Sequence, residues 1–226
     1  MKKNNTTEKQ LANIEESLSK TEQYIEKNSK NLSFIIGFMV LLFIGIYSYK
    51  NLYIKPLNQS AQDKLFVAEQ YFENNQFEEA LNGNNEFDGF LLIMDEYSNT
   101  QSGKLARYYS GVCYLKTGNF IEAIKTLEKY TSKDKLMLSI SKMSIGDAFV
   151  ELNQPKEAIE YYEKALSINN NDVTSPIILM KCAKLYQKQL NHKKAVKLYN
   201  QIKNDYPNSN ISKSIEKYIN SVQLTS

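Results

Sequence analysis

Histidine, cysteine and tryptophan are scarce in this chain of 226 residues, which has one, two and none of them, respectively. His192 stands beside two lysines that would repel a cation, so we expect it in a solvated turn rather than in a metal site. Cys113 and Cys182 are expected to be small buried side chains rather than a disulfide. The sequence also has no nucleophile elbow, glycine-rich phosphate loop or zinc-protease motif. These absences predict no enzymatic activity, no cofactor and no metal ligand.

Proline and glycine are also rare, with four and eight residues, respectively. Most of them stand near proposed breaks, and apolar residues recur at intervals of three and four between those breaks. No convincing pair of strands can be found. The sequence therefore predicts an all-α fold.

A repeated pattern organises the chain from about residue 60 onward. Four times, a small residue is followed three positions later by an aromatic residue and nine positions after that by an alanine. The twelve residues are Ala68, Tyr71 and Ala80; Gly111, Tyr114 and Ala123; Gly146, Phe149 and Ala158; and Ala183, Tyr186 and Ala195. The alanines are 43, 35 and 37 residues apart, close to the period of repeats built from two helices. We expect these residues to pack where the two helices of each pair meet.

This pattern resembles tetratricopeptide repeats over residues 60–208. The resemblance implies an α-solenoid of about four helix pairs that binds proteins or peptides. We expect residues 209–226 to contain a capping helix with an apolar stripe, followed by a short tail. The stripe consists of Ile211, Ile215, Tyr218, Ile219 and Val222.

The first repeat departs from the pattern through a predicted insertion at residues 82–89. Two interpretations of this loop stay open: a glycine-containing turn, which we favour, and a partial calcium-binding loop. The residues at calcium-loop spacing are Asn84, Glu86, Asp88, Gly89 and Asp95.

Residues 32–49 contain no charged side chain and are long enough, at about 1.5 Å per helical residue, to cross the hydrocarbon core of a bilayer. We predict one transmembrane helix here, followed by a linker at residues 50–59. A cleaved signal peptide is a poorer explanation, because about thirty polar residues precede the run and tyrosines end it. Lysines are balanced on the two sides, so the expected topology rests on the general behaviour of signal anchors. Residues 1–31 would form a partly helical cytoplasmic tail.

The tail and the span also allow a structural role. Leu11, Ile14 and Leu18 form a short heptad-like stripe, while Gly37 and Gly45 share one helix face of the span. These features would suit a homo-oligomeric spacer. A weakly helical solvated tail and lipid-facing glycines explain the same residues.

Charge changes sign along the repeat region. Residues 50–100 carry three basic and nine acidic side chains, whereas residues 181–226 carry nine basic and two acidic ones. The basic end would suit an acidic partner or anionic lipid headgroups, or would serve solubility alone. We expect no nucleic-acid partner. The residues predicted to line a protein-binding groove are Tyr108, Tyr109, Lys142 and Lys181.

The succession of a short tail, one span and repeats resembles the bacterial family that includes the ancillary subunit of the SecYEG translocon. It also resembles membrane-anchored tetratricopeptide proteins of Bacteroidetes. This resemblance implies a single-pass protein of the bacterial inner membrane with a periplasmic repeat domain. Its partners would be the Sec translocon, periplasmic chaperones or envelope complexes. A receptor facing the cytoplasm is the alternative if the topology is reversed.

Overall fold

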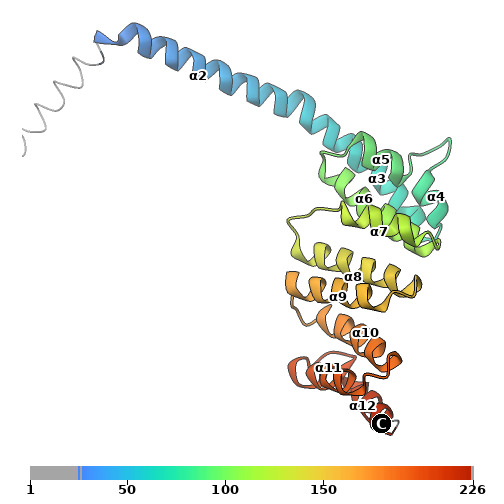
Figure 1. Cartoon of the computed structure of the whole chain (residues 1–226). Coiled ribbons are helices and arrows are strands. Elements are labelled where there is room, and N and C mark those ends of the chain that lie inside the picture. The colour runs from blue at the N-terminus through green and yellow to red at the C-terminus, as the bar shows by residue number, and fades with distance from the viewer. Residues whose placement is uncertain (1–24, 26, 225–226) are drawn as a thin grey trace, which may run out of the picture. The chain divides into compact units, whose positions relative to one another are not determined.

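The structure is a computed structural model that describes residue 25 and residues 27–224 (Figure 1). Within these residues every regular element is a helix, and the only β-type pairing is an isolated bridge between Gly83 and Asp88. The chain divides into two units, residues 1–56 and 57–226, which are described separately. The predicted all-helical class is thus observed in the described part of the chain.

The first unit contains the apolar helix α2 (Ser29–Tyr49), which has no buried residue. By length and composition, this helix could cross a membrane. Its C-terminal bound coincides with the end of the predicted span. The predicted tail at residues 1–31 lies mostly outside the described residues, as does its stripe of Leu11, Ile14 and Leu18.

The predicted linker at residues 50–59 is helical, and the division between the two units falls inside it, after Pro56. It contains the π-helix η1 (Lys50–Ile54) and the start of α3 (Lys55–Glu73). Its polar residues do not prevent a helix, and its only proline, Pro56, follows the wider π-helical turn in which Lys55 N–H donates to the Lys50 carbonyl.

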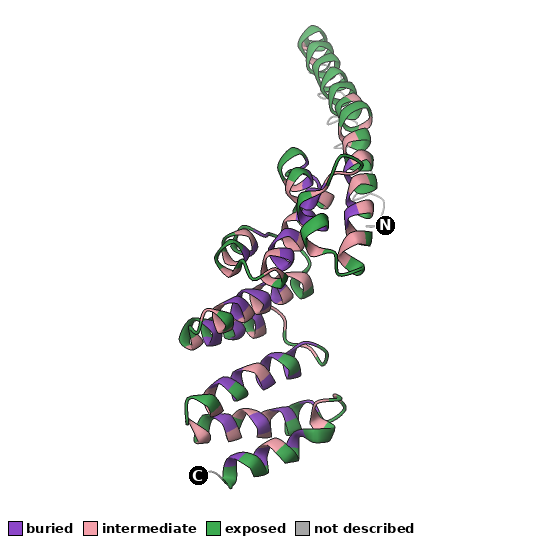
Figure 2. Ribbon diagram, turned by 90° about the vertical axis from the view of Figure 1, so that its right-hand side faces the viewer, coloured by how far each residue is buried: buried purple, intermediate pink, exposed green. Residues whose placement is uncertain are grey.

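The second unit is built from four helix pairs with two additional helices, α5 (Phe90–Glu96) and α12 (Ile215–Gln223). The pairs are α3 with α4 (Phe77–Asn82), α6 (Gln101–Lys116) with α7 (Phe120–Glu128), α8 (Lys135–Glu151) with α9 (Pro155–Ile168), and α10 (Ser175–Lys188) with α11 (His192–Asp205). From α6 to α12, each of these α-helices contacts the next in the chain. Figure 2 shows the buried residues on the faces that meet inside this stack.

The two helices of every pair are joined by the same turn. One residue of each turn has a positive φ: Asn75 (60°), Gly118 (82°), Asn153 (55°) and Leu190 (60°). Each lies five positions before the repeat alanine. The next residue donates its N–H to the carbonyl of the repeat aromatic over 2.8–2.9 Å, which closes the first helix as in a Schellman motif. The repeat register therefore gives the position of the turn in each pair as well as the positions of the helices.

The small residues lie where helices approach most closely. A β-carbon on Gly146 would lie 2.5 Å from the Tyr162 ring, and one on Gly111 would lie 2.4 Å from Leu127 Cγ. The other small repeat residues are fully buried: Ala68, Ala80, Ala123, Ala158, Ala183 and Ala195. Close packing explains why alanine or glycine occupies these positions.

The repeat aromatics are less central than the sequence suggested. Tyr71, Tyr114, Phe149 and Tyr186 are only half-buried against the apolar clusters, because each lies beside the turn that ends its helix. The fully buried tyrosines come instead from the second helices. They are Tyr162 and Tyr199, each four residues after a repeat alanine.

The segment between α4 and α5 coincides with the predicted insertion. Gly83 and Gly89 are pressed together there, since a β-carbon on either would lie within 2.3 Å of the other's backbone nitrogen. The Asn84 Oδ1 atom accepts hydrogen bonds from the N–H groups of Glu86 and Phe87. Asp88 forms an ion pair with Lys64 at 2.6 Å. These contacts agree with the turn interpretation, in which the loop's own backbone and Lys64 engage the side chains.

After α11, the chain passes through the 3-10 helix η2 (Ser212–Ser214) into α12. Ile215, Ile219 and Val222 of α12 are buried against α10 and α11. Tyr218 and Ile211 pack half-buried beside them. The last repeat therefore has its apolar face covered, as expected of a capping helix.

Candidate protein-binding cleft

A cleft of about 650 Å³ lies along the first helices of the second, third and fourth pairs. These helices, α6, α8 and α10, contribute most of its lining, and the α6–α7 connection, the start of α7 and α9 supply the rest. The lining residues are Leu115, Lys116, Gly118, Phe120, Asp147, Val150, Glu151, Tyr162, Lys181, Lys184 and Leu185. Three successive repeats thus form one continuous concave surface.

The repeat register explains why these side chains share one face. Asp147 and Lys184 each follow the small residue of their helix by one position, and Lys116 and Glu151 follow theirs by five. Positions one and five are four residues apart and therefore lie one turn above each other on a helix. The cleft thus has charges of both signs, with Leu115, Val150 and other apolar side chains between them.

A hydrogen-bonded group joins the third and fourth repeats inside the cleft. The Asp147 Oδ1 atom accepts a hydrogen bond from the Tyr162 hydroxyl at 2.6 Å. The same atom forms an ion pair with Lys181 Nζ at 2.7 Å. Burial, together with the nearby Asp147 charge, raises the pKa of Tyr162 far above its ordinary value. The hydroxyl therefore remains a proton donor, and Lys181 links α10 to α8.

Three further charges remain exposed at the cleft: Lys116, Glu151 and Lys184. They alternate basic, acidic and basic from one repeat to the next. The Lys184 ammonium also lies 5.5 Å from the ring centroid of Tyr218, within cation–π range. A surface of this kind can hold a segment by apolar contact and select it by charge.

Of the four residues predicted to line a groove, only Lys181 lines this cleft. Tyr109 stacks on Phe90 of α5 with centroids 5.0 Å apart, and burial raises its pKa to about 12. Tyr108 packs against Tyr130 at 5.6 Å. Both tyrosines therefore pack against the protein's own aromatic side chains instead of lining the cleft. These neighbours come from α5 and from the chain after α7, which lie outside the repeat pattern.

Lys142 also lies elsewhere. Burial lowers its pKa, and the charges that affect it belong to Glu128 and Lys164, on α7 and α9. It therefore faces the second helices rather than the cleft. Sequence reasoning missed Lys116, Asp147, Glu151 and Lys184, although offsets of one and five from the small residue would have found them.

The described residues contain no group of three or more His, Cys, Asp or Glu side chains that could hold a metal ion. His192 is the first residue of α11 and half-buried, so it is not the freely solvated turn residue that we expected. Both cysteines are free and buried. Burial raises the pKa of each thiol to about 12.

Comparison with protein families gave matches to tetratricopeptide-repeat models at residues 105–134, 141–172 and 179–209. These ranges coincide with the pairs α6–α7, α8–α9 and α10–α11. A search of curated proteins found no matching relative. Because the three matched segments also line the cleft, the matches and the geometry concern the same surface. The chain therefore carries tetratricopeptide repeats, which act as scaffolds for protein–protein interaction.

Proposed function

We propose that this chain is a membrane-anchored scaffold that holds segments of partner proteins in the cleft of α6, α8 and α10. The observation that carries the proposal is the continuity of this cleft over three repeats, with apolar and charged side chains interleaved. An extended or helical segment could contact all three repeats at once. No catalytic role is part of the proposal.

The anchor in this proposal is the span at residues 32–49. The apolar composition of α2 and its lack of any buried residue support this assignment, because an exposed apolar surface is favourable in lipid and costly in water. Tyr47, Tyr49 and Tyr53 follow the apolar run and are exposed. Tyrosine at this place suits the membrane–water interface.

The proposed location is the bacterial inner membrane, with the amino terminus in the cytoplasm and the repeats in the periplasm. There the scaffold would assist protein translocation or the assembly of envelope complexes, beside the Sec translocon or periplasmic chaperones. Among the described residues, the one candidate span lies near the amino terminus, which supports this arrangement.

Topology is tested by fusing an alkaline phosphatase or a fluorescent reporter after Ser226. Active phosphatase with a dark fluorescent fusion would support the periplasmic role. The opposite pair of results would replace it with a cytoplasmic receptor, while leaving the cleft as the binding surface. Cysteine crosslinking from Gly37 would meanwhile detect the homo-oligomeric spacer as self-adducts.

A further inference from the structure

A second groove lies on the other side of the stack, between the second helices α9 and α11, with α10 as its floor. Its volume is about 250 Å³. Glu163 and Leu166 line it from α9, and Lys194, Lys197, Leu198 and Gln201 from α11; Leu179, Cys182 and Tyr186 form the floor. None of these residues lines the cleft of the proposed function.

The equivalent place one repeat earlier, between α7 and α9, is occupied by a side chain of the protein itself. The ring of Tyr161 stacks on Phe149 with centroids 5.3 Å apart, and its hydroxyl donates to Glu128. Tyr161 thus connects the floor helix α8 with the preceding second helix α7.

The repeat register shows what changes in the later groove. Tyr186 takes the place of Phe149 and Glu163 that of Glu128, but Leu198 replaces Tyr161. A leucine can neither stack nor donate a hydrogen bond. The aromatic floor and the carboxylate acceptor are therefore both retained, and the side chain that would join them is missing.

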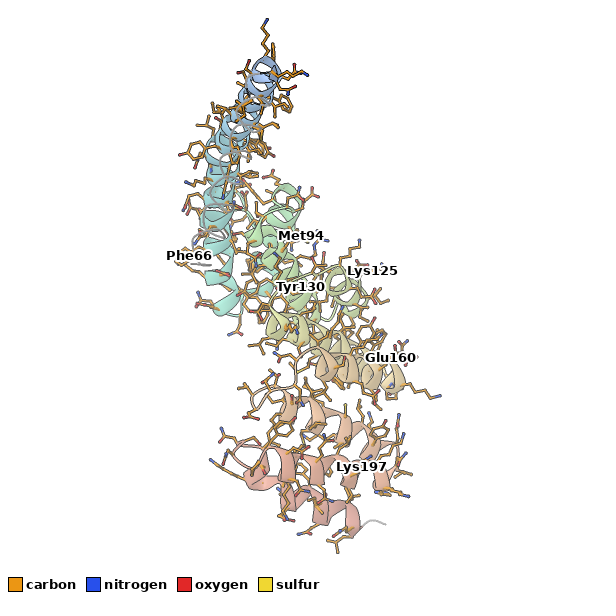
Figure 3. The ribbon with its side chains drawn as sticks, turned by 90° about the vertical axis from the view of Figure 1, so that its left-hand side faces the viewer. Phe66, Met94, Lys125, Tyr130, Glu160 and Lys197 are labelled. Atoms are coloured by element: carbon orange, nitrogen blue, oxygen red, sulfur yellow. The ribbon has the colours of Figure 1, made fainter. Side chains whose placement is uncertain are left out.

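The charges beside the groove are reversed as well. Glu157 and Glu160 on α9 correspond to Lys194 and Lys197 on α11. Figure 3 labels Lys125, Glu160 and Lys197, one on each of the second helices α7, α9 and α11. Lys194 Nζ lies over the Tyr186 ring, 4.8 Å from its centroid, so positive charge lies at the aromatic floor itself.

We propose that the groove between α9 and α11 binds a tyrosine side chain of a partner protein, presented within an acidic segment. The ring stacks on Tyr186 as Tyr161 stacks on Phe149, and the hydroxyl donates to Glu163. The acidic neighbours of that tyrosine pair with Lys194 and Lys197. This site is independent of the cleft, so either can fail without the other.

The test uses the full chain in detergent and the peptide Ac-Glu-Glu-Tyr-Glu-Glu-amide, with binding followed by calorimetry. We expect saturable binding that weakens about fivefold when phenylalanine replaces the peptide's tyrosine, since one hydrogen bond is lost. Lys197→Glu should weaken binding about tenfold by placing repulsion beside the acidic segment. Lys156→Glu, on the exposed surface of α9 outside the groove, is the matched control and should bind as the unchanged chain does.

The decisive variant is Leu198→Tyr, which would fill the groove with a tyrosine of the protein itself, as Tyr161 does one repeat earlier. It should raise Tm by about 2–4 °C and abolish peptide binding. Retained binding in a folded Leu198→Tyr protein would overturn the proposal. If that variant does not fold, equal binding by the unchanged chain, Glu163→Gln and Lys197→Glu would overturn it instead. Concentration-dependent dimerisation that Leu198→Tyr abolishes would mean that a second copy, and not another protein, fills the groove.

Discussion

Gly146 of α8 lies directly against the ring of Tyr162 of α9, so closely that a β-carbon on the glycine would be 2.5 Å from the ring's Cε1 atom. The contact brings the two helices of the third repeat together and places the Tyr162 hydroxyl at Asp147 in the cleft. One small residue thus serves both helix packing and the geometry of the candidate binding surface.

Gly146→Ala should destabilise the protein. Overpacking of this kind costs about 1–3 kcal/mol, which exceeds the gain of at most about 1 kcal/mol from better helix propensity. Urea unfolding measures the change. In a Tyr162→Leu background the penalty should shrink, because the smaller side chain removes the clash; an equal penalty in both backgrounds would refute this explanation.

Leu190 is the only one of the four positive-φ turn residues that is neither glycine nor asparagine. Its side chain is 77% exposed, so little hydrophobic burial depends on it. Leu190→Asn should therefore stabilise the protein by about 1 kcal/mol through relief of backbone strain. The matched reverse change, Asn153→Leu, should destabilise it by a similar amount. Thermal unfolding of both variants tests the pair, and shifts of the same sign would contradict it.

Stability should decrease at alkaline pH. Burial raises the pKa of Cys113 from 9.0 to about 12, so above pH 9 the unfolded chain releases this proton while the folded chain retains it. The free energy of unfolding should therefore fall as the pH rises from about 9 towards 12, and this contribution should be constant below 9. Urea unfolding at pH 8 and pH 10.5 measures the effect. Cys113→Ala should reduce the slope, and an unchanged slope would rule out this source.

The ion pair between Asp147 and Lys181 should contribute little to stability. Both side chains are about one-third exposed, and such pairs contribute about 0–1 kcal/mol. A double-mutant cycle with Asp147→Asn and Lys181→Met measures the coupling. A coupling well above 1 kcal/mol would mean that the pair holds the third and fourth repeats together rather than shaping the cleft.

The repeat register could be read from the sequence because close helix packing and left-handed turns each restrict the residue type. Gly111 and Gly146 stand where a β-carbon would collide, and Asn75, Gly118 and Asn153 where φ is positive. The fully buried alanines follow from the same restriction. Local constraints of this kind restrict the residue type, so they can be recognised in a single sequence.

The cleft was predicted less well, because its composition depends on contacts between helices far apart in the chain. Tyr109 looked available on α6, yet Phe90 of α5 stacks on it. Lys142 and Lys181 occupy similar places in their helices but face different sides of the stack. Only the register offset from the small residue distinguishes them.

The central claim is that partner proteins occupy the cleft, and site-specific photocrosslinking in living cells tests it most directly. A photoreactive amino acid replaces Lys116, which lines the cleft, or Lys156, an exposed residue of α9 outside it. We predict discrete adducts from position 116, their loss when Lys184→Glu and Glu151→Lys reverse the neighbouring charges, and no such adducts from position 156. The same adducts from both positions, or none from 116, would contradict the claim.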